Sequence, residues 1–211
     1  MSDFRIKTCV LGPVSTNCYI LYRQGGRDAV VVDPADNGEY IANQCKELGV
    51  LPSAVVLTHG HFDHIMAVED LKRTFRAEIY GSAGEEELFS DSTLNLSRDW
   101  MGRVVSFHAD VTLRDGQEIE LLGMKWKALE TPGHTAGSMC YYIEEEGILL
   151  SGDTLFCESY GRTDLPTGSG AQIADSIRNK LFLLPDDTMV YPGHGEPTTI
   201  GHEKQYNPLA G

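Results

Sequence analysis

The densest group of metal-binding side chains in this 211-residue chain is the segment His59-Gly60-His61-Phe62-Asp63-His64. Imidazole nitrogens bind zinc and iron, and carboxylate oxygens suit hard divalent ions. The segment follows an apolar run at residues 54–57, which predicts a tight loop after a strand, with these four side chains turned inward. We expect Gly60 to supply the backbone freedom that such a loop needs. Three of the seven histidines lie here, which favours a metal site over a solvated polar loop.

Three isolated residues extend this set. His134, Asp153 and His194 each follow a β-like run, and each is directly preceded by a glycine that indicates a turn. Functional sites on sheet scaffolds are commonly built from loops at one end of the sheet. A lone histidine after a strand is more typical of a structural turn. Only the combination with the histidine segment predicts a shared site.

Together these residues resemble the metallo-β-lactamase superfamily, whose motif His-x-His-x-Asp-His is followed by a distant His, Asp and His. All seven positions are matched, and the resemblance extends over essentially the whole chain. Within the superfamily, residues 152–156, 161–164 and 198–203 are similar to the glyoxalase II-type hydrolases. Those proteins hydrolyse thioesters of hydroxy acids with small thiols such as glutathione.

The resemblance implies a centre with two divalent metal ions, most simply zinc, with iron or manganese as alternatives. It assigns His59, His61 and His134 to one ion, assigns Asp63, His64 and His194 to the other, and makes Asp153 the bridge between them. Two such ions share a water, lower its pKa toward neutrality and polarise a carbonyl, so that no serine or cysteine nucleophile is required. Asp63 and Asp153 are the catalytic carboxylates that the resemblance implies.

The leaving group favours a small-molecule thioester as the substrate. A thiol has a pKa of about 8.5 and leaves with little protonation, whereas a β-lactam amine must receive a proton. The full-length glyoxalase II enzymes carry a further helical domain after the last metal histidine, and here 17 residues follow His194. Thioester chemistry is therefore a firmer expectation than glutathione itself. One group of zinc β-lactamases has a cysteine where Asp153 stands, which disfavours that group.

Other functions remain open from the sequence. A sulfur dioxygenase of the same superfamily binds one iron through the positions of His59, His134 and Asp153, which form a set of two histidines and one carboxylate. Hydrolysis of a lactone, a β-lactam or a phosphodiester on the same fold is a further alternative, and the lack of a basic surface counts against a nuclease. A non-catalytic binding module is disfavoured because no ligand position is lost.

Several further polar residues have two interpretations. Asp33 could orient a metal-binding histidine through its free N–H, or it could cap the turn at Pro34. Arg162 is a candidate anchor for a substrate carboxylate, and a structural pair with Asp164 is the alternative. His108 and His202 match no metal position of the superfamily, and we expect both to be structural or solvated.

Charge and composition narrow the range of binding partners and cell compartments that we expect for this protein. The net charge of −14, from 17 basic and 31 acidic residues, argues against nucleic-acid binding. No apolar run approaches 18 residues and no leader is visible, so we expect neither a membrane span nor secretion. The five cysteines lack CxxC spacing, which is typical of reduced thiols in a cytoplasm. Of these, Cys157 is expected near the site, as a packing residue or a functional one. The oligomeric state stays open.

We read residues 1–211 as one domain, because no linker-like break in composition divides them. Strands followed by helices in each half predict two facing sheets with helices outside, an α/β fold. The resemblance implies the four-layer αβ/βα sandwich of the superfamily, with the metals at one edge. The expected strands are residues 4–11, 18–22, 29–32, 54–57, 77–80, 111–113, 117–122, 124–129, 138–143, 148–150 and 189–191, and the expected helices are residues 38–48, 65–76, 84–89 and 173–184, with Thr198 capping a last one.

Overall fold

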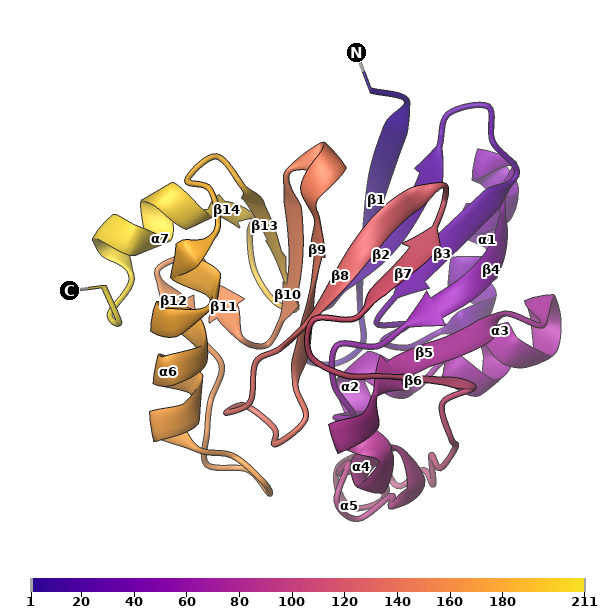
Figure 1. Ribbon diagram of the computed structural model, residues 1–211. Helices are drawn as coiled ribbons and strands as arrows, with labels where there is room; N and C mark the ends of the chain where they lie inside the picture. The colour runs from indigo at the N-terminus through magenta and orange to yellow at the C-terminus, as the bar shows by residue number, and fades with distance from the viewer. Residues whose placement is uncertain (1, 211) are drawn as a thin grey trace.

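Two six-stranded β-sheets face each other in the computed structural model, which describes residues 2–210 (Figure 1). The first sheet takes its strands in chain order. Its β1–β2–β3 part is antiparallel, and β3 to β6 are parallel. The strands are β1 (Phe4–Leu11), β2 (Thr16–Arg23), β3 (Asp28–Val32), β4 (Leu51–Val56), β5 (Glu78–Ser82) and β6 (Val111–Leu113).

The second sheet has the order β14-β13-β10-β9-β8-β7, with β10 and β13 parallel. A separate short hairpin, β11 (Leu155–Phe156) with β12 (Ser159–Tyr160), lies beyond the end of β10. The strands of the second sheet are β7 (Glu118–Leu121), β8 (Met124–Glu130), β9 (Met139–Ile143), β10 (Ile148–Gly152), β13 (Met189–Pro192) and β14 (Thr198–Thr199).

Helices cover the outer face of each sheet (Figure 1). Helices α1 (Gly38–Leu48) and α3 (Val68–Phe75) pack on the first sheet, and α6 (Gly170–Asn179) and α7 (Ile200–Tyr206) pack on the second. At one end lie three short helices, α2 (Phe62–Ile65), α4 (Glu86–Ser90) and α5 (Ser97–Met101). Single 3₁₀ turns complete the elements, η1 (Ala83–Glu85), η2 (Glu144–Glu146) and η3 (Leu181–Leu183).

Three apolar clusters hold these layers together. One lies between the first sheet and its helices, a second between the two sheets, and a third between the second sheet and α6 and α7. Strand β8 shows the underlying pattern, since Met124, Trp126 and Ala128 alternate with exposed residues and point into the central cluster. Helix, sheet, sheet and helix thus form four layers, which confirms the predicted αβ/βα sandwich.

Two expected helices are interrupted in the structure. Of the helix expected at residues 65–76, residues 68–75 form α3. Ile65 instead ends α2, because the backbone leaves helical geometry at Ala67 (φ −105°, ψ 7°). The helix expected at residues 173–184 breaks at Lys180 and continues as the turn η3. The predicted cap of the last helix is wrong by one residue. Thr199 accepts the His202 N–H, whereas the Thr198 hydroxyl donates to Glu203.

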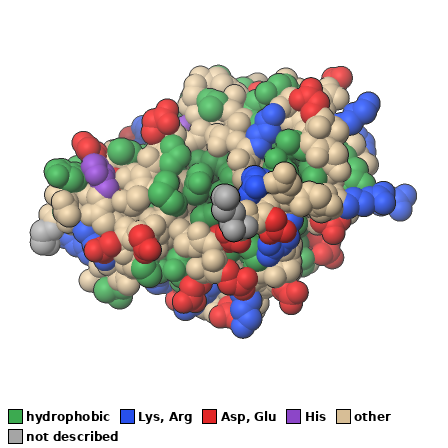
Figure 2. All heavy atoms as spheres, turned by 90° about the horizontal axis from the view of Figure 1, so that it is seen from above, with side chains coloured by type: hydrophobic (Ala, Val, Ile, Leu, Met, Phe, Trp, Pro, Cys, Tyr) green, Lys and Arg blue, Asp and Glu red, His purple; other side chains and the backbone are tan. Residues whose placement is uncertain are grey.

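The end opposite α4 and α5 carries no concentration of one charge. On this face, lysine and arginine side chains are scattered among acidic and apolar ones (Figure 2). Within residues 2–210, no helix combines the length and apolarity needed to cross a bilayer. All five cysteines are free; four are buried and Cys157 is exposed.

Candidate metal centre

Four strands deliver the seven predicted ligands to one end of the sandwich. The histidine segment follows β4, and His134 follows β8, while Asp153 and His194 follow β10 and β13. All four loops start at carboxyl ends of strands, the end at which open α/β sheets bind ligands. Two contacts join the sheets here, since the N–H of Met139 and the hydroxyl of Tyr141 donate to carbonyl oxygens just after β4. The sandwich therefore brings together residues that are up to 135 positions apart, from His59 to His194.

Three histidines form the first group, which we call the imidazole set: His59, His61 and His134. His61 Nδ1 and His134 Nε2 face each other at 2.9 Å, and the ring of His59 lies edge-on to both. His134 Nδ1 donates to the carbonyl oxygen of Arg162 at 2.7 Å, so its Nε2 lone pair points into the group. His59 Nε2 is buried without a hydrogen-bond partner among the described residues.

The second group, the carboxylate set, consists of Asp63, His64 and His194. Asp63 Oδ2 lies 3.4 Å from His64 Nε2 and 3.2 Å from His194 Nε2, and it accepts the Thr16 hydroxyl at 2.8 Å. Thr16 starts β2 and forms an isolated β-bridge with His194, so the same strand end positions two members of the set. The three side chains converge from separate loops on one point.

Asp153 lies between the two sets. Its Oδ1 is 3.3 Å from His64 Nε2, and its Oδ2 is 3.4 Å from His194 Nε2 and 3.5 Å from His134 Nε2. The carboxylate thus contacts both sets, as a bridging ligand must. The bridging role that the sequence resemblance implied for Asp153 requires such a placement and stays a prediction.

Asp33 orients His64 from behind. Its Oδ2 lies 2.9 Å from His64 Nδ1, and the carboxylate also accepts the Thr58 N–H at 2.8 Å and the Thr58 hydroxyl at 2.7 Å. A carboxylate at Nδ1 directs the other ring nitrogen, Nε2, at the centre. Of the two interpretations left open by the sequence, the structure supports orientation of a histidine.

Glycines let the backbone approach these ligands closely. A Cβ on Gly193 would lie 2.1 Å from Asp153 Oδ1, and one on Gly152 would lie 2.3 Å from the Thr58 hydroxyl. The reason expected for Gly60 is wrong, because its φ is not positive. A Cβ there would instead meet Leu88 Cβ at 2.7 Å, so Gly60 is required for space rather than for backbone freedom.

The two sets differ in how they hold protons before a metal binds. Burial, and then the neighbouring His134, lowers the pKa of His61 to about 3. Burial likewise lowers the pKa of His59 well below its usual value, reinforced by three nearby histidines. Burial also acts to lower the pKa of His194, but hydrogen bonds with Asp153 and Asp63 raise it to about 10. For His64, Asp63 and Asp153 outweigh burial in the same way and raise the pKa well above its usual value.

This donor set fits a divalent metal centre. Nitrogen and carboxylate donors without sulfur suit zinc, iron and manganese. His59 Nε2, His64 Nε2 and Asp153 Oδ1 are all buried without a hydrogen-bond partner in the described part of the chain. Buried polar atoms are normally satisfied, and metal ions held by the two sets together with Asp153 would satisfy all three.

Comparison with known proteins agrees with this geometry. A family model described as the metallo-β-lactamase superfamily matches residues 11–194. The chain belongs to the metallo-β-lactamase superfamily. Divalent metal binding through a His/Asp cluster is a property of that superfamily fold.

One curated relative and two solved structures are similar to this chain over nearly its whole length. The hydroxyacylglutathione hydrolase GloC of Haemophilus influenzae is 34% identical over 92% of this chain and 92% of its own length. The crystal structure of the BLEG-1 B3 metallo-β-lactamase superimposes with a TM-score of 0.92 and 39% identity, covering 98% of this chain and 100% of that one. A protein crystallised in a di-iron-bound form has a TM-score of 0.85 and 33% identity, covering 96% and 99%.

The remaining predicted residues lie at or outside the margin of the centre. Arg162 lines the pocket, but its guanidinium forms a fork with Asp164, with Nε and Nη2 each 2.7 Å from a carboxylate oxygen. The hydrogen bond from Arg162 lowers the pKa of Asp164 to about 2. His108 pairs with Glu86 and His202 with Glu158, and neither histidine belongs to the two sets.

Cys157 follows the pocket residue Phe156 but does not line the pocket. Its sulfur lies near His202 and Glu203 instead. Glu203 uses its carboxylate oxygens to accept the Thr198 hydroxyl, the Glu158 N–H and the Asn207 amide. This group therefore ties the hairpin β11–β12 to α7.

Sequence reasoning missed three residues that support the site. Thr16 was hidden because its partner Asp63 lies 47 positions away. Glu85 stands first in a run of three glutamates, a pattern typical of a solvated surface, yet it is fully buried and accepts the N–H groups of Gly60 and Gly137 at 2.7 and 2.8 Å. Its burial raises its pKa to about 7. Trp100 lines the pocket from α5, a helix that the sequence pattern did not predict.

Proposed function

We propose that this protein hydrolyses small thioesters at a centre of two divalent metal ions, zinc first, with iron or manganese as alternatives. One observation carries the proposal. Members of both sets, His61 and His134 from one and Asp63 and His194 from the other, line one pocket together with Asp153. None of the residues that line it in the described chain is a serine, cysteine, lysine or tyrosine. The pocket thus offers donors for metal ions but no hydroxyl, thiol or amine side chain that could serve as a covalent nucleophile.

Two ions bound by these sets would lower the pKa of a shared water and polarise a substrate carbonyl. The chain contributes orientation, since Asp33 fixes His64, the Arg162 carbonyl fixes His134, and Thr16 fixes Asp63. In the reaction, the oxygen of water bonds to the carbonyl carbon and the carbon–sulfur bond breaks. The sulfur leaves with the bonding electrons as a thiolate. One proton of the water goes to this thiolate and the other is released to solvent, so the products are a carboxylate, a thiol and a proton.

The choice of a thioester rests on the leaving group. A thiolate with a conjugate pKa of about 8.5 leaves without a proton donor. An amine needs one, and the titratable groups that line the pocket are all metal ligands, apart from Arg162, which is paired with Asp164. The similarity to GloC, which is a hydroxyacylglutathione hydrolase by name, supports the same choice. The partner is then a small molecule, and we propose neither a nucleic-acid nor a membrane partner.

β-Lactam hydrolysis is the second candidate, favoured by the 39% identity and nearly complete overlap with a B3 metallo-β-lactamase. Sulfur dioxygenation with a single iron at His59, His134 and Asp153 remains a further alternative, because those residues offer two imidazoles and one carboxylate. The three activities differ in what they consume, so one panel of assays separates them.

The test loads metal-free protein separately with zinc, ferrous iron or manganese. Each form is assayed with a hydroxyacyl thioester, a β-lactam and a persulfide, the last in an oxygen electrode. We expect thioester hydrolysis to exceed β-lactam hydrolysis in kcat/KM, with no oxygen uptake. Faster β-lactam turnover would replace the proposal with the second candidate, and oxygen uptake by the iron form would replace it with the dioxygenase.

A further inference from the structure

The pocket above the metal centre has apolar walls. It encloses about 280 Å³, which is at the small end for ligand sites. Its floor is made by ligands of both sets. Its walls come from separate places in the chain: the β1–β2 turn, helix α5, strand β11 and the segment before α6, through Val14, Leu96, Trp100, Phe156 and Leu165.

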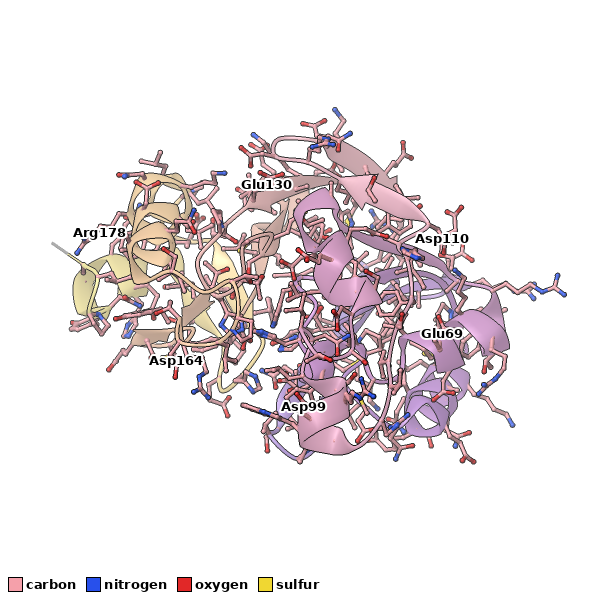
Figure 3. The ribbon with its side chains drawn as sticks, turned by 90° about the horizontal axis from the view of Figure 1, so that it is seen from below. Glu69, Asp99, Asp110, Glu130, Asp164 and Arg178 are labelled. Carbon is pink, nitrogen blue, oxygen red and sulfur yellow. The ribbon has the colours of Figure 1, made fainter. Side chains whose placement is uncertain are left out.

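Figure 3 views this end of the molecule from below. Helix α5, where Asp99 is labelled, lies on the side of the first sheet, and the segment with Asp164 lies on the side of the second sheet. The pocket is lined by Trp100 from α5 and by Leu165 from the other segment. Trp100 is 52% exposed and its ring lies 5.6 Å from that of the buried Phe62. A large aromatic surface is therefore left open beside the metal ligands.

This aromatic wall is held in place by the histidine segment itself. The Phe62 N–H donates to the Asn95 carbonyl at 2.8 Å. Asn95 is fully buried, and its side-chain amide donates to the carbonyls of Leu88 and Val105, while its Oδ1 accepts the Ser97 N–H that opens α5. Trp100 thus belongs to a wall whose position is fixed relative to the ligands, which is what a selective surface requires.

Away from the metal ligands, the side chains that line the pocket do not favour a substrate with an anionic far end. Arg162 is the one lysine or arginine among the described lining residues, and Asp164 occupies its fork. The chain as a whole carries a net charge of −14, which repels anions at long range. A substrate with additional carboxylates, such as a glutathione thioester, finds no unpaired lysine or arginine here.

We propose that the substrate is a thioester with a short apolar acyl group, and that Trp100 is the residue that selects it by packing against that group. The inference rests on the proposed thioesterase function and specifies its substrate class. Burial of each methylene against the walls should lower KM about three- to fourfold until the pocket is full. A carboxylate at the far end of the acyl chain should cancel that gain, because it would be desolvated without a free cation.

The kinetic test compares acetyl, butyryl, hexanoyl and adipoyl thioesters of one small neutral thiol. Hexanoyl and adipoyl have the same number of carbons, and adipoyl adds a terminal carboxylate. We expect KM to fall from acetyl to hexanoyl and to be at least about tenfold higher for adipoyl than for hexanoyl. In Trp100→Ala, KM for hexanoyl should rise about tenfold, with acetyl nearly unchanged and kcat similar. Leu183→Ala is the matched control, since Leu183 is 76% exposed and lies outside the pocket.

A binding measurement separates failure of this inference from failure of the proposed function. The chain has two tryptophans, and the other one, Trp126, is fully buried between the sheets. Hexanoate should quench the fluorescence of Trp100, adipoate should do so only at much higher concentration, and Trp100→Phe should abolish the response. If no thioester is turned over yet hexanoate binds, the proposed function fails and the apolar site stands. If thioesters are turned over with no dependence on chain length, or adipoyl is preferred, the inference is overturned.

Discussion

The two ligand sets of this centre differ in the direction in which their surroundings shift the pKa of their histidines. In the imidazole set, three buried histidines face one another, and burial with mutual repulsion keeps the pKa of His59 and His61 low. In the carboxylate set, aspartates raise the pKa of His64 and His194, and those histidines lower the pKa of Asp63. His59 and His61 therefore present neutral nitrogens that are ready for a metal ion. The second set holds protons that a metal ion must displace.

This difference predicts that the two ions of the proposed dinuclear centre are bound with unequal affinity. Removing a proton from His194 costs affinity at neutral pH, because its pKa is about 10 in the metal-free protein. The carboxylates that retain this proton, Asp63 and Asp153, also attract a dication. In the carboxylate set, a metal ion therefore replaces a positive charge that is already present. The imidazole set gains a charge where none was present. We therefore expect the two metals to respond differently to substitution and to pH.

The largest expected effect is at the residue that contacts both sets. Asp153→Ala should leave less than one metal per chain, because its carboxylate lies within 3.5 Å of His64, His134 and His194. Losing both ions removes several kcal/mol of transition-state stabilisation, so kcat/KM for a thioester should fall at least about 10³-fold. Elemental analysis and steady-state kinetics measure the two outcomes. Asp187→Ala, at an exposed aspartate, should change neither. Two metals retained in Asp153→Ala would refute its bridging role.

The site residues could be predicted because their signal is local, whereas their supports could not. Six positions contain four ligands, and each distant ligand stands beside a glycine after an apolar run. Glu85 and Thr16 gave no such signal, since their partners lie 25 and 47 positions away. A contact of that kind depends on how the sheets are packed, and periodicity along the chain does not report it.

The same distinction separates the elements of the fold that the sequence predicted from those that it did not. Alternation and apolar runs predicted most strands, because one face of each strand is buried. The break at Ala67 and the five-residue helix α5 were missed, because the segments that carry them are fixed by tertiary contacts such as the hydrogen bond from Phe62 to Asn95. The role of Gly60 was misjudged for the same reason, since only the folded chain brings Leu88 against it.

A second prediction separates the two sets by substitution. His61→Ala should remove the metal of the imidazole set and Asp63→Ala that of the carboxylate set, so each variant should retain about one ion per chain. Each should lower kcat/KM by about 10²- to 10³-fold. Metal counting after gel filtration, followed by stepwise reconstitution, gives the stoichiometry. If either variant loses both ions, the sets are not independent and the comparison fails.

A third prediction uses pH. Because His194 and His64 have raised pKa values, they hold protons in the metal-free folded protein at neutral pH and must release them when metal binds. Lowering the pH from about 8 to about 6 should therefore weaken the carboxylate-set metal by about ten- to a hundredfold per pH unit. His61, with a pKa of about 3, adds no such dependence to the imidazole set over that range. Competition with a weak chelator at each pH measures the affinities of both metals. If both ions were lost to the same extent as the pH falls, the predicted difference between the two sets would be contradicted.

The smallest expected effect is that of a substitution at Asp33, whose side chain contacts His64 of the carboxylate set. Asp33 adopts a left-handed backbone conformation (φ 48°) that asparagine also tolerates, so Asp33→Asn changes the charge behind His64 without straining the chain. Removing a carboxylate behind a metal-binding histidine typically lowers metal affinity by about 10- to 100-fold. The loss should be confined to the carboxylate-set metal.

The imidazole set supplies the matched control for that substitution, because its supporting group is part of the backbone. His134 donates to the carbonyl of Arg162, which Arg162→Ala leaves in place. Arg162→Ala should therefore leave the affinity of both metals unchanged, although it breaks the pair with Asp164. Isothermal titration of each metal-free variant with zinc resolves the two sites. Equal weakening of both metals in Asp33→Asn would mean that Asp33 supports the whole end of the sandwich, through its bonds to Thr58, rather than one set of ligands.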